Sequence, residues 1–513
     1  MHKHMIVMLG LVAGMATAVP ALAATAGEVA APVVVKTADG EVRGAVGARV
    51  RSFQGIPYAA PPVGERRWKS PAPVVPWSGV REATSPGASC AQPGGYPIGV
   101  PSDNEDCLYL NVTTPARARA KLPVIVWIHG GSMMYGTGDM YGPQRLVGGG
   151  AVVVSMNYRL GVMGFLANDA VGGEASFGLE DQQAALRWVR KNVAAFGGDP
   201  RNVTIAGQSG GGYAVCGHLA SPKSAGLFDR ASVQSAPCAT DGSRTMAEAK
   251  ADSDRVVTAV GCDGATDVAA CLRRVPAATL LKAYGDFHEP RPVSGTAILP
   301  RTPAEALRTG RFNRVPVLVG VNHDEENGMV LGQELAPGGA PMKDEEYAPA
   351  VRKQFGDHAG AVLKRYPLSK YGSAGEALAA LRTDSAWSAP SLNTARLLSR
   401  WTPTRMYEFA ERDTPWFAGY PTPSFPARAQ HMAELPYIFD LKLFDELTPA
   451  QTRLGDRLIG LWVRFAAGQA DWPSFRNDWY VQSLTSGTWR RAAFTADHAY
   501  RFWTALPRMT PAT

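Results

Sequence analysis

The sequence has no dense basic run and, beyond its first residues, no apolar run of 18 residues. A membrane-spanning helix needs about 20 consecutive apolar residues, so we expect the mature chain to have no stable membrane anchor. The formal charge of +7 is small for 513 residues, and no stretch of Lys and Arg alternates with aromatic residues, so nucleic-acid binding has no support. No cysteine or histidine spacing is typical of a zinc site, and we expect no metal and no cofactor.

What remains is the composition of a large globular enzyme. Hydrophobic residues make up 45% of the chain, and its 54 Gly and 39 Pro are scattered, without repeats or low-complexity segments. Chains of this length commonly form more than one domain, but large α/β enzymes can use one sheet with insertions. We expect residues 24–513 to form such a single domain.

The first 23 residues have the pattern of a Sec signal peptide. Lys3 precedes an apolar run over residues 5–16, and residues 21–23 (ALA) form a small-residue cleavage site. The sequence therefore predicts an exported protein, periplasmic or secreted.

The cysteines are few and even in number, which favours disulfides in an exported chain. Pairing sequence neighbours closes short loops and is our first choice: Cys90 with Cys107, and Cys262 with Cys271. The remaining two, Cys216 and Cys238, either pair or are buried thiols.

Short β-rich runs alternate with helical patterns, which predicts an α/β fold with a large, mostly parallel sheet and helices on both faces. The expected strands cover residues 124–127, 152–155, 203–206, 231–234, 315–319 and 405–409. Each is nearly all apolar, as is typical of strands covered on both faces. An amphipathic helix is expected over residues 179–196, and residues 243–310 and 330–400 are expected to be helical insertions over the active site.

Ser209 lies in the pentapeptide GQSGG, residues 207–211, after an expected strand and before an expected helix. A G-x-S-x-G sequence in that context predicts a nucleophile elbow, in which flanking glycines leave room for a strained serine. Without the strand and the helix, the pentapeptide alone would be only a suggestive match.

A serine hydroxyl needs donors that stabilise the oxyanion formed when it attacks a carbonyl. The expected strand that begins at Val124 ends in His129, Gly130, Gly131 and Ser132, the type of loop that supplies such N–H groups in esterases. We expect the donors to be the backbone N–H groups of Gly131, Ser132 and Gly210. The alternative is an ordinary turn between a strand and a helix.

Together these motifs resemble the type-B carboxylesterase family, the cholinesterase-like branch of the α/β-hydrolase fold. The resemblance runs over roughly residues 30–480 and rests on a series of motifs. They are residues 53–59 (FQGIPYA), 105–112 (EDCLYLNV), 127–131 (WIHGG), 157–161 (NYRLG), 178–182 (GLEDQ) and the serine pentapeptide. The family resemblance implies the α/β-hydrolase fold and a catalytic triad in the order Ser, acid, His.

The resemblance places the other two members of the triad. The family's acid follows a strand in a G-x-N-x-D-E-G pattern, which residues 320–325 match, so Glu325 is the implied acid. Glu326 stands where the family has glycine, and it remains the alternative acid. The family's histidine precedes a string matched by residues 434–439 (ELPYIF), which implies His431.

The resemblance also implies supporting roles for other residues. Ser235 matches a family serine that hydrogen-bonds the acid, and the pairs Cys90–Cys107 and Cys262–Cys271 match two family disulfides.

Several positions depart from the family in ways that concern specificity. Gln208 stands where many relatives carry Glu, and the loop from Cys90 to Cys107 lacks the tryptophan that holds a quaternary ammonium in cholinesterases. Tyr96 is that loop's only aromatic residue. Met133 and Met134 replace an aromatic residue and predict an apolar, adaptable pocket wall.

The prediction is a serine ester hydrolase that acts through an acyl-enzyme on small uncharged or anionic esters rather than choline esters. The alternatives are a lipase, lactonase or amidase with the same machinery, or a binding module without catalysis. The presence of Ser209, Glu325 and His431 argues against the binding module.

Overall fold

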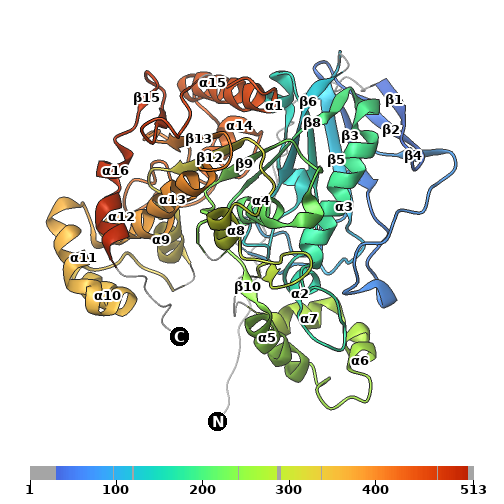
Figure 1. Ribbon diagram of the computed structural model, residues 1–513, viewed down its shortest axis with the longest axis horizontal. Coiled ribbons are helices and arrows are strands. Elements are labelled where there is room, and N and C mark those ends of the chain that lie inside the picture. The colour runs from blue at the N-terminus through green and yellow to red at the C-terminus, as the bar shows by residue number, and fades with distance from the viewer. Residues whose placement is uncertain are drawn as a thin grey trace, which may run out of the picture.

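The computed structural model describes residues 31–506, except 96–97, 118–120, 241, 286–289, 337 and 471. The expected signal peptide, residues 1–23, lies outside the described residues, as does Tyr96. Figure 1 shows a large twisted sheet in the middle of the molecule with helices on both sides.

The sheet contains thirteen strands in the described part of the chain, and its central strands are parallel. In spatial order these are β7 (Val152–Met156), β6 (Leu122–Ile128), β8 (Gly198–Gln208), β9 (Arg230–Gln234), β12 (Val317–Asn322), β13 (Thr404–Phe409) and β14 (Val481–Leu484). Antiparallel strands extend one edge, namely β1 (Ala31–Lys36), β2 (Glu41–Val46), β3 (Val50–Pro57) and β5 (Tyr109–Pro115), and β15 (Arg490–Arg491) extends the other. Strand β4 (Val80–Glu82) pairs with β2. The mostly parallel sheet expected from the sequence is confirmed.

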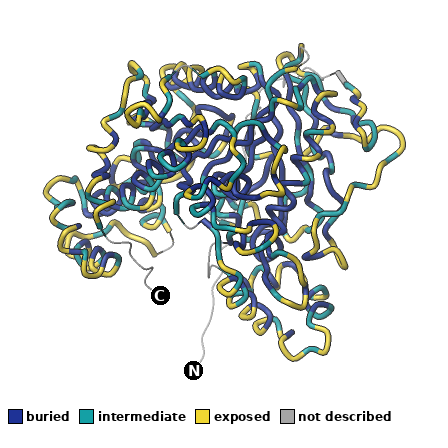
Figure 2. The backbone as a smooth tube through the Cα atoms, viewed as in Figure 1, coloured by how far each residue is buried: buried dark blue, intermediate teal, exposed yellow. Residues whose placement is uncertain are grey.

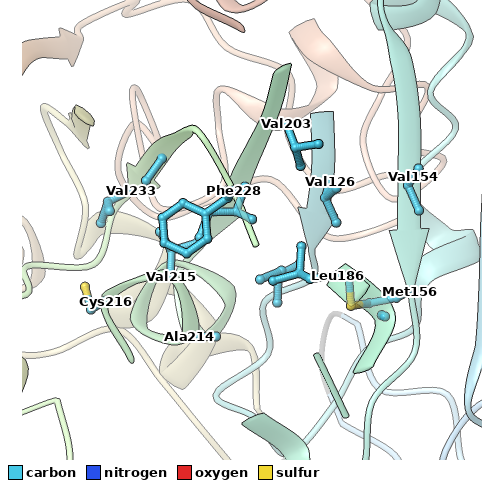
Figure 3. Packing of buried hydrophobic residues seen from close by; sticks show 14 of the residues in the cluster. Val126, Val154, Met156, Leu186, Val203, Ala214, Val215, Cys216, Phe228 and Val233 are labelled. Atoms are coloured by element: carbon cyan, nitrogen blue, oxygen red, sulfur yellow. The ribbon is translucent and has the colours of Figure 1, made fainter. Parts of the chain in front are cut away.

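The central strands are apolar throughout because both faces are covered. Successive side chains of β6 point to opposite faces. Val126 packs in one cluster with α3 (Phe177–Asn192) and α4 (Gly210–Ala220), and Trp127 packs in another with α15 (Pro449–Ala466). Figure 3 shows the first cluster, in which residues of β6, β7 and β8 meet Leu186 of α3 and Val215 of α4.

The expected elements are present with shifted ends. The expected strand at 315–319 begins at Val317, because the preceding Pro316 has no N–H to give to a ladder. The expected helix over 179–196 is α3 followed by a 3-10 turn at Val193–Phe196. Gly197 ends that turn with a φ of 92°, a left-handed conformation that favours glycine.

The two insertions are helical, as expected. The first contains α5 (Met246–Ala259), α6 (Val268–Arg274), α7 (Ala277–Tyr284) and α8 (Pro303–Thr309), with the short strands β10 (Arg244–Thr245) and β11 (Val293–Ser294). The second contains α9 (Asn327–Leu335), α10 (Asp344–Phe355), α11 (Ala359–Arg365), α12 (Ala374–Arg382) and α13 (Ala389–Leu398). Helices α5–α6 and α10–α11 project from the sheet, and Figure 2 shows their outer sides as exposed.

Short helices fill the remaining connections. They are α1 (Gln144–Gly148), α2 (Gly161–Phe165), α14 (Leu435–Ile438), α16 (Phe494–Asp497) and α17 (Tyr500–Ala505). None of the helices in the described part of the chain combines the length and the apolar character needed to cross a membrane.

All six cysteines form disulfides. Cys90 is joined to Cys107 and Cys262 to Cys271, in agreement with the expected pairs. Cys216 of α4 is joined to Cys238 after β9, which decides between the two readings that the sequence left open. This third bond ties the helix after Ser209 to the neighbouring strand connection.

A buried ion pair joins two of the sequence motifs. The guanidinium of Arg159 donates two hydrogen bonds to the carboxylate of Asp181, Nε to Oδ2 at 2.8 Å and Nη2 to Oδ1 at 2.7 Å. The two side chains are 4% and 0% exposed. Two residues on, the N–H of Gly161 donates to the carbonyl of Met133, so the pair also fixes the loop after β6.

We expect Asp181→Asn to lower the free energy of unfolding by about 3–5 kcal/mol, because it leaves the buried charge of Arg159 without its partner. Urea denaturation of both proteins measures the change. The matched control is Asp456→Asn, which breaks an exposed pair with Arg145 and should cost less than about 1 kcal/mol. Equal losses in the two variants would contradict this account of the fold.

Candidate active site

Ser209 lies between β8 and α4, in a sharp turn at the carboxyl end of the sheet. Its backbone has φ 55° and ψ −123°, a conformation that is costly for a residue with a Cβ. The N–H of Ser209 donates to the carbonyl of Gln234 on the next strand, and its carbonyl accepts from the N–H of Tyr213. These two bonds hold the strained serine in place at the start of a helix.

The flanking glycines are required by close backbone contacts. A Cβ on Gly207 would lie 2.4 Å from the carbonyl oxygen of Gly211, and one on Gly211 would lie 2.0 Å from that of Ile128. Both distances are far below van der Waals contact, so any side chain there would force the turn apart. The structure thus has the strand, turn and helix that the pentapeptide predicted.

The loop after β6 lies directly against this turn. Gly131, Ser132 and Met133 have φ values of 99°, 54° and 57°, and a Cβ on Gly210 would lie 2.8 Å from the nitrogen of Ser132. Among the described residues, the N–H groups of Gly131 and Gly210 have no hydrogen-bond acceptor. Unpaired donors beside a serine hydroxyl can bind a developing oxyanion.

His129 contacts this loop through its buried ring. Its ring is buried and stacks on Tyr158 at 4.5 Å, and its Nδ1 lies 2.9 Å from the carbonyl of Gly130. Burial lowers the pKa of His129 to about 4, so the ring is neutral near pH 7. A neutral ring can donate from Nδ1 and fix the path of the loop.

His431 and Glu325 form a short, buried contact. Nδ1 of the imidazole lies 2.6 Å from Oε2 of Glu325, and the two side chains are 5% and 0% exposed. The other oxygen of Glu325 accepts from the N–H of Asn322 at 2.8 Å. The carboxylate is therefore bound on both oxygens and fixes which imidazole nitrogen carries hydrogen.

The charge of Glu325 controls the basicity of His431. Burial alone lowers the pKa of this histidine, but the charge and hydrogen bond of Glu325, with smaller contributions from Glu434 and Glu326, raise it above its ordinary value. Glu434 is a second buried acid that interacts with Glu325 and His431, and burial raises the pKa of the Glu434 carboxyl to about 7. The sequence string that placed His431 contains Glu434, but nothing in it indicated a buried acid.

Gln208 contacts the free nitrogen of His431. Its Nε2 lies 3.0 Å from Nε2 of the imidazole, and the amide donates to the ring's lone pair. No hydrogen bond joins Oγ of Ser209 to His431 or to any other described residue. Gln208 was expected to act through its missing charge, and this direct contact was not predicted.

Glu326, the alternative acid, does not contact the imidazole through a hydrogen bond. Its Oε1 accepts from Nε1 of Trp387 at 2.7 Å, and the indole ring lies 4.8 Å from the ring of His431. Burial raises the pKa of the Glu326 carboxyl. The geometry thus favours Glu325 as the partner of His431.

Ser235 differs from its expected role. It is buried with φ 46°, and its N–H donates to the carbonyl of Gly320, but its Oγ has no hydrogen-bond partner among the described residues. The hydrogen bond to the acid that the resemblance implied is therefore not formed. Asn322 holds Glu325 instead, through its backbone N–H.

The remaining described histidines have other surroundings. His218 is buried between Gln182 and Ser224, and burial lowers its pKa to about 3. His323, Glu408 and His498 place potential metal-binding atoms within 4.8 Å of one another. Both nitrogens of His498, however, lie 2.6 Å from carboxylate oxygens, of Asp384 and of Glu408.

That arrangement suits a proton better than a metal. Burial lowers the pKa of His498, but hydrogen bonds and charges of Asp384 and Glu408 raise it to about 10. A doubly hydrogen-bonded imidazolium has no lone pair for a metal ion. His288, another histidine in the sequence, lies outside the described residues.

A pocket of about 260 Å³ opens beside Ser209. Its walls come from the loop after β6, the start of α4 and both insertions, with apolar surface from Met133, Met329 and Trp387. Glu326, Tyr213 and Arg291 contribute polar groups, and the guanidinium of Arg291 lies 4.9 Å above the ring of Tyr213. Met133 lines the pocket as predicted, whereas Met134 packs into a separate core cluster.

Similar proteins are ester hydrolases. The chain is 34% identical to a cocaine esterase of Oryctolagus cuniculus, over 86% of this chain and 90% of that protein. It is 33% identical to the para-nitrobenzyl esterase of Bacillus subtilis, over 87% and 93% of the two chains. It is also 33% identical to the fumonisin B1 esterase of Sphingopyxis macrogoltabida, over 92% and 89%.

The solved structure of a PNB esterase has the same fold. It superposes with a TM-score of 0.76 at 30% identity, over 91% of this chain and 99% of that one, which identifies the α/β-hydrolase fold. The family model described as the carboxylesterase family matches residues 31–503. The chain therefore belongs to the carboxylesterase family and is a carboxylic ester hydrolase.

Proposed function

We propose that the enzyme hydrolyses esters through an acyl-enzyme on Ser209, with His431 as the base and Glu325 as the acid that orients it. The observation that carries this proposal is the 2.6 Å contact between Nδ1 of His431 and Glu325, next to the strained turn at Ser209. That contact leaves Nε2 as the lone-pair nitrogen. Trp387 packs on the ring and limits its rotation.

In the first half-reaction, Oγ of Ser209 attacks the ester carbonyl and its proton passes to Nε2 of His431. In the structure, the amide of Gln208 donates to this same nitrogen. That hydrogen bond must break when substrate binds, so that the hydroxyl of Ser209 can donate to Nε2 instead. The tetrahedral intermediate then expels the alcohol, which takes the proton from His431. Water repeats the sequence on the acyl-enzyme and releases the acid.

The oxyanion is bound by the backbone N–H groups of Gly131, Ser132 and Gly210 in this proposal. Support comes from the unpaired donors of Gly131 and Gly210 and from the contact of the loop with Gly210.

We further propose small uncharged or anionic esters as substrates, rather than choline esters. The neutral Gln208 and the absence of tryptophan between Cys90 and Cys107 support this exclusion of quaternary ammonium groups. The modest pocket volume of about 260 Å³ supports short acyl or alcohol groups.

We expect Ser209→Ala to lower kcat/KM for 4-nitrophenyl butyrate by about 10⁴-fold or more, because the nucleophile is lost. Wild type should give a burst of 4-nitrophenol and a butyryl adduct by mass spectrometry. The control is Ser232→Ala on β9, which removes a buried hydroxyl without a hydrogen-bond partner in the described part of the chain. This variant should keep the wild-type activity. A burst that persists in Ser209→Ala would overturn the mechanism.

Replacing the two neighbouring acids should separate their roles. Glu325→Gln should lower kcat by about 10⁴-fold, because the amide cannot hold the imidazole in the productive tautomer. Glu326→Gln should reduce kcat far less, because its amide oxygen can still accept from Trp387. The reverse order of the two losses would transfer the acid role to Glu326.

The pH profile gives a second readout for the same pair. The neutral form of His431 is the base, so kcat/KM should fall as the pH decreases through a midpoint above 6.5, the ordinary pKa. Removing the charge of Glu325 lowers the pKa of His431. The residual activity of Glu325→Gln should therefore fall with a midpoint at lower pH than that of the wild type. An acid limb that is unchanged in Glu325→Gln would contradict the assignment.

We also propose export by the Sec-type signal peptide, supported by the pattern of residues 1–23. Expressed with its own N-terminus in a bacterial host, the protein should be recovered outside the cytoplasm. N-terminal sequencing should then begin at Ala24. An uncleaved chain that stays in the cytoplasm would contradict this proposal.

A further inference from the structure

Glu326 is an acid in the wall of the pocket that contains Ser209. It follows Glu325 at the end of β12, and its N–H donates to Oγ of Thr383, which fixes its backbone against the second insertion. Two acids thus stand side by side here, and only Glu325 contacts His431 through a hydrogen bond. The mechanism proposed above uses neither of its oxygens.

The two oxygens of Glu326 have different surroundings. Oε1 is held by Nε1 of Trp387 at 2.7 Å, whereas Oε2 has no hydrogen-bond partner among the described residues. Trp387 also lies against His431, so the carboxyl is anchored at a fixed distance from the base. An anchored carboxyl with one open oxygen is a preorganised acceptor.

The rest of the pocket favours a ligand that donates a hydrogen bond to Oε2. Met133, Met329 and Trp387 provide apolar walls, so an apolar ligand that displaced water would leave Oε2 unpaired. An unpaired buried acceptor costs free energy, and a bound donor removes that cost. Arg291, which lines the same pocket, disfavours a cationic donor, whereas a neutral hydroxyl is compatible with both charges.

We propose that Glu326 is a specificity residue that accepts a hydrogen bond from a hydroxyl group of the substrate, so that hydroxylated esters are the preferred class. Partial esters of polyols and esters of hydroxy acids belong to this class. The inference rests on the proposed function, because it takes Ser209 as the nucleophile and this pocket as the substrate site.

A purely structural role would have a different signature. If Glu326 served only to hold Trp387 against His431, its removal would slow all esters by the same factor. A binding role instead changes the ratio between two esters that differ only in a hydroxyl. The ratio is therefore the decisive measurement.

Two matched pairs of esters test both sides of the scissile bond. In the first pair, ethyl 3-hydroxybutyrate and ethyl butyrate, the hydroxyl is on the acyl group. In the second pair, 3-hydroxypropyl butyrate and propyl butyrate, it is on the alcohol group. For wild type, kcat/KM of the hydroxylated ester should exceed that of its partner by about tenfold or more in at least one pair, the typical effect of a hydrogen bond to a charged group.

Variants at the position should remove this preference. Glu326→Gly, the residue of the family pattern, should bring the ratio close to one. Glu326→Gln keeps an oxygen for Trp387 but turns an amide NH₂ to the pocket, so the ratio should fall by several-fold. The control Glu345→Gln changes an exposed acid at the start of α10 and should leave the ratio at its wild-type value.

The outcomes are distinct. A wild-type ratio near one in both pairs, or equal losses for both members of each pair in the two Glu326 variants, would overturn the inference. Either result leaves the proposed function intact if ethyl butyrate is still cleaved through Ser209. Continued hydrolysis by Ser209→Ala would instead remove the proposed function, whatever the ratios are.

Discussion

The carboxyl ends of parallel strands meet at one edge of a sheet, and the arrangement of the whole site depends on this register. Strand β6 ends in the loop with Gly131, β8 ends at Ser209, and β12 ends just before Glu325. The backbone of Ser209 is bonded to Gln234 at the end of β9, and that of His431 to Glu325. A shift of one strand would separate these groups by several ångströms.

The parts of the site that the sequence predicted are those fixed by backbone geometry. Residues 207–211 accept few residue types, because there is no space for a side chain at Gly207 or Gly211. Their pattern therefore indicated the turn and its serine. Six of the central strands were found because they are apolar on both faces, with Val126 packed on one side and Trp127 on the other, whereas the antiparallel strands at the edges and β14 were not predicted. Position 431 could be inferred only by resemblance, since no local pattern marks a histidine that reaches its partner through a long connection.

The contacts that the sequence did not predict are made by side chains from distant segments. Gln208 reaches His431 across 223 positions, and Trp387 reaches Glu326 across 61 positions, so no spacing could reveal either hydrogen bond. The acid accepts a hydrogen bond from the backbone N–H of Asn322, whereas Oγ of Ser235, the partner that the resemblance implied, has no hydrogen-bond partner among the described residues. Long-range side-chain contacts are decided by packing, which the order of residues along the chain does not show.

The ring of His498 joins segments that are distant in the sequence. It lies between Asp384 and Glu408, two buried carboxylates, and hydrogen-bonds to both. Glu408 belongs to β13, in the sheet, and Asp384 to the second insertion, so residue 498, from a third segment, links the two. Loss of the segment that carries His498 would leave two buried carboxylates without this donor, and the contact between the sheet and the insertion would weaken.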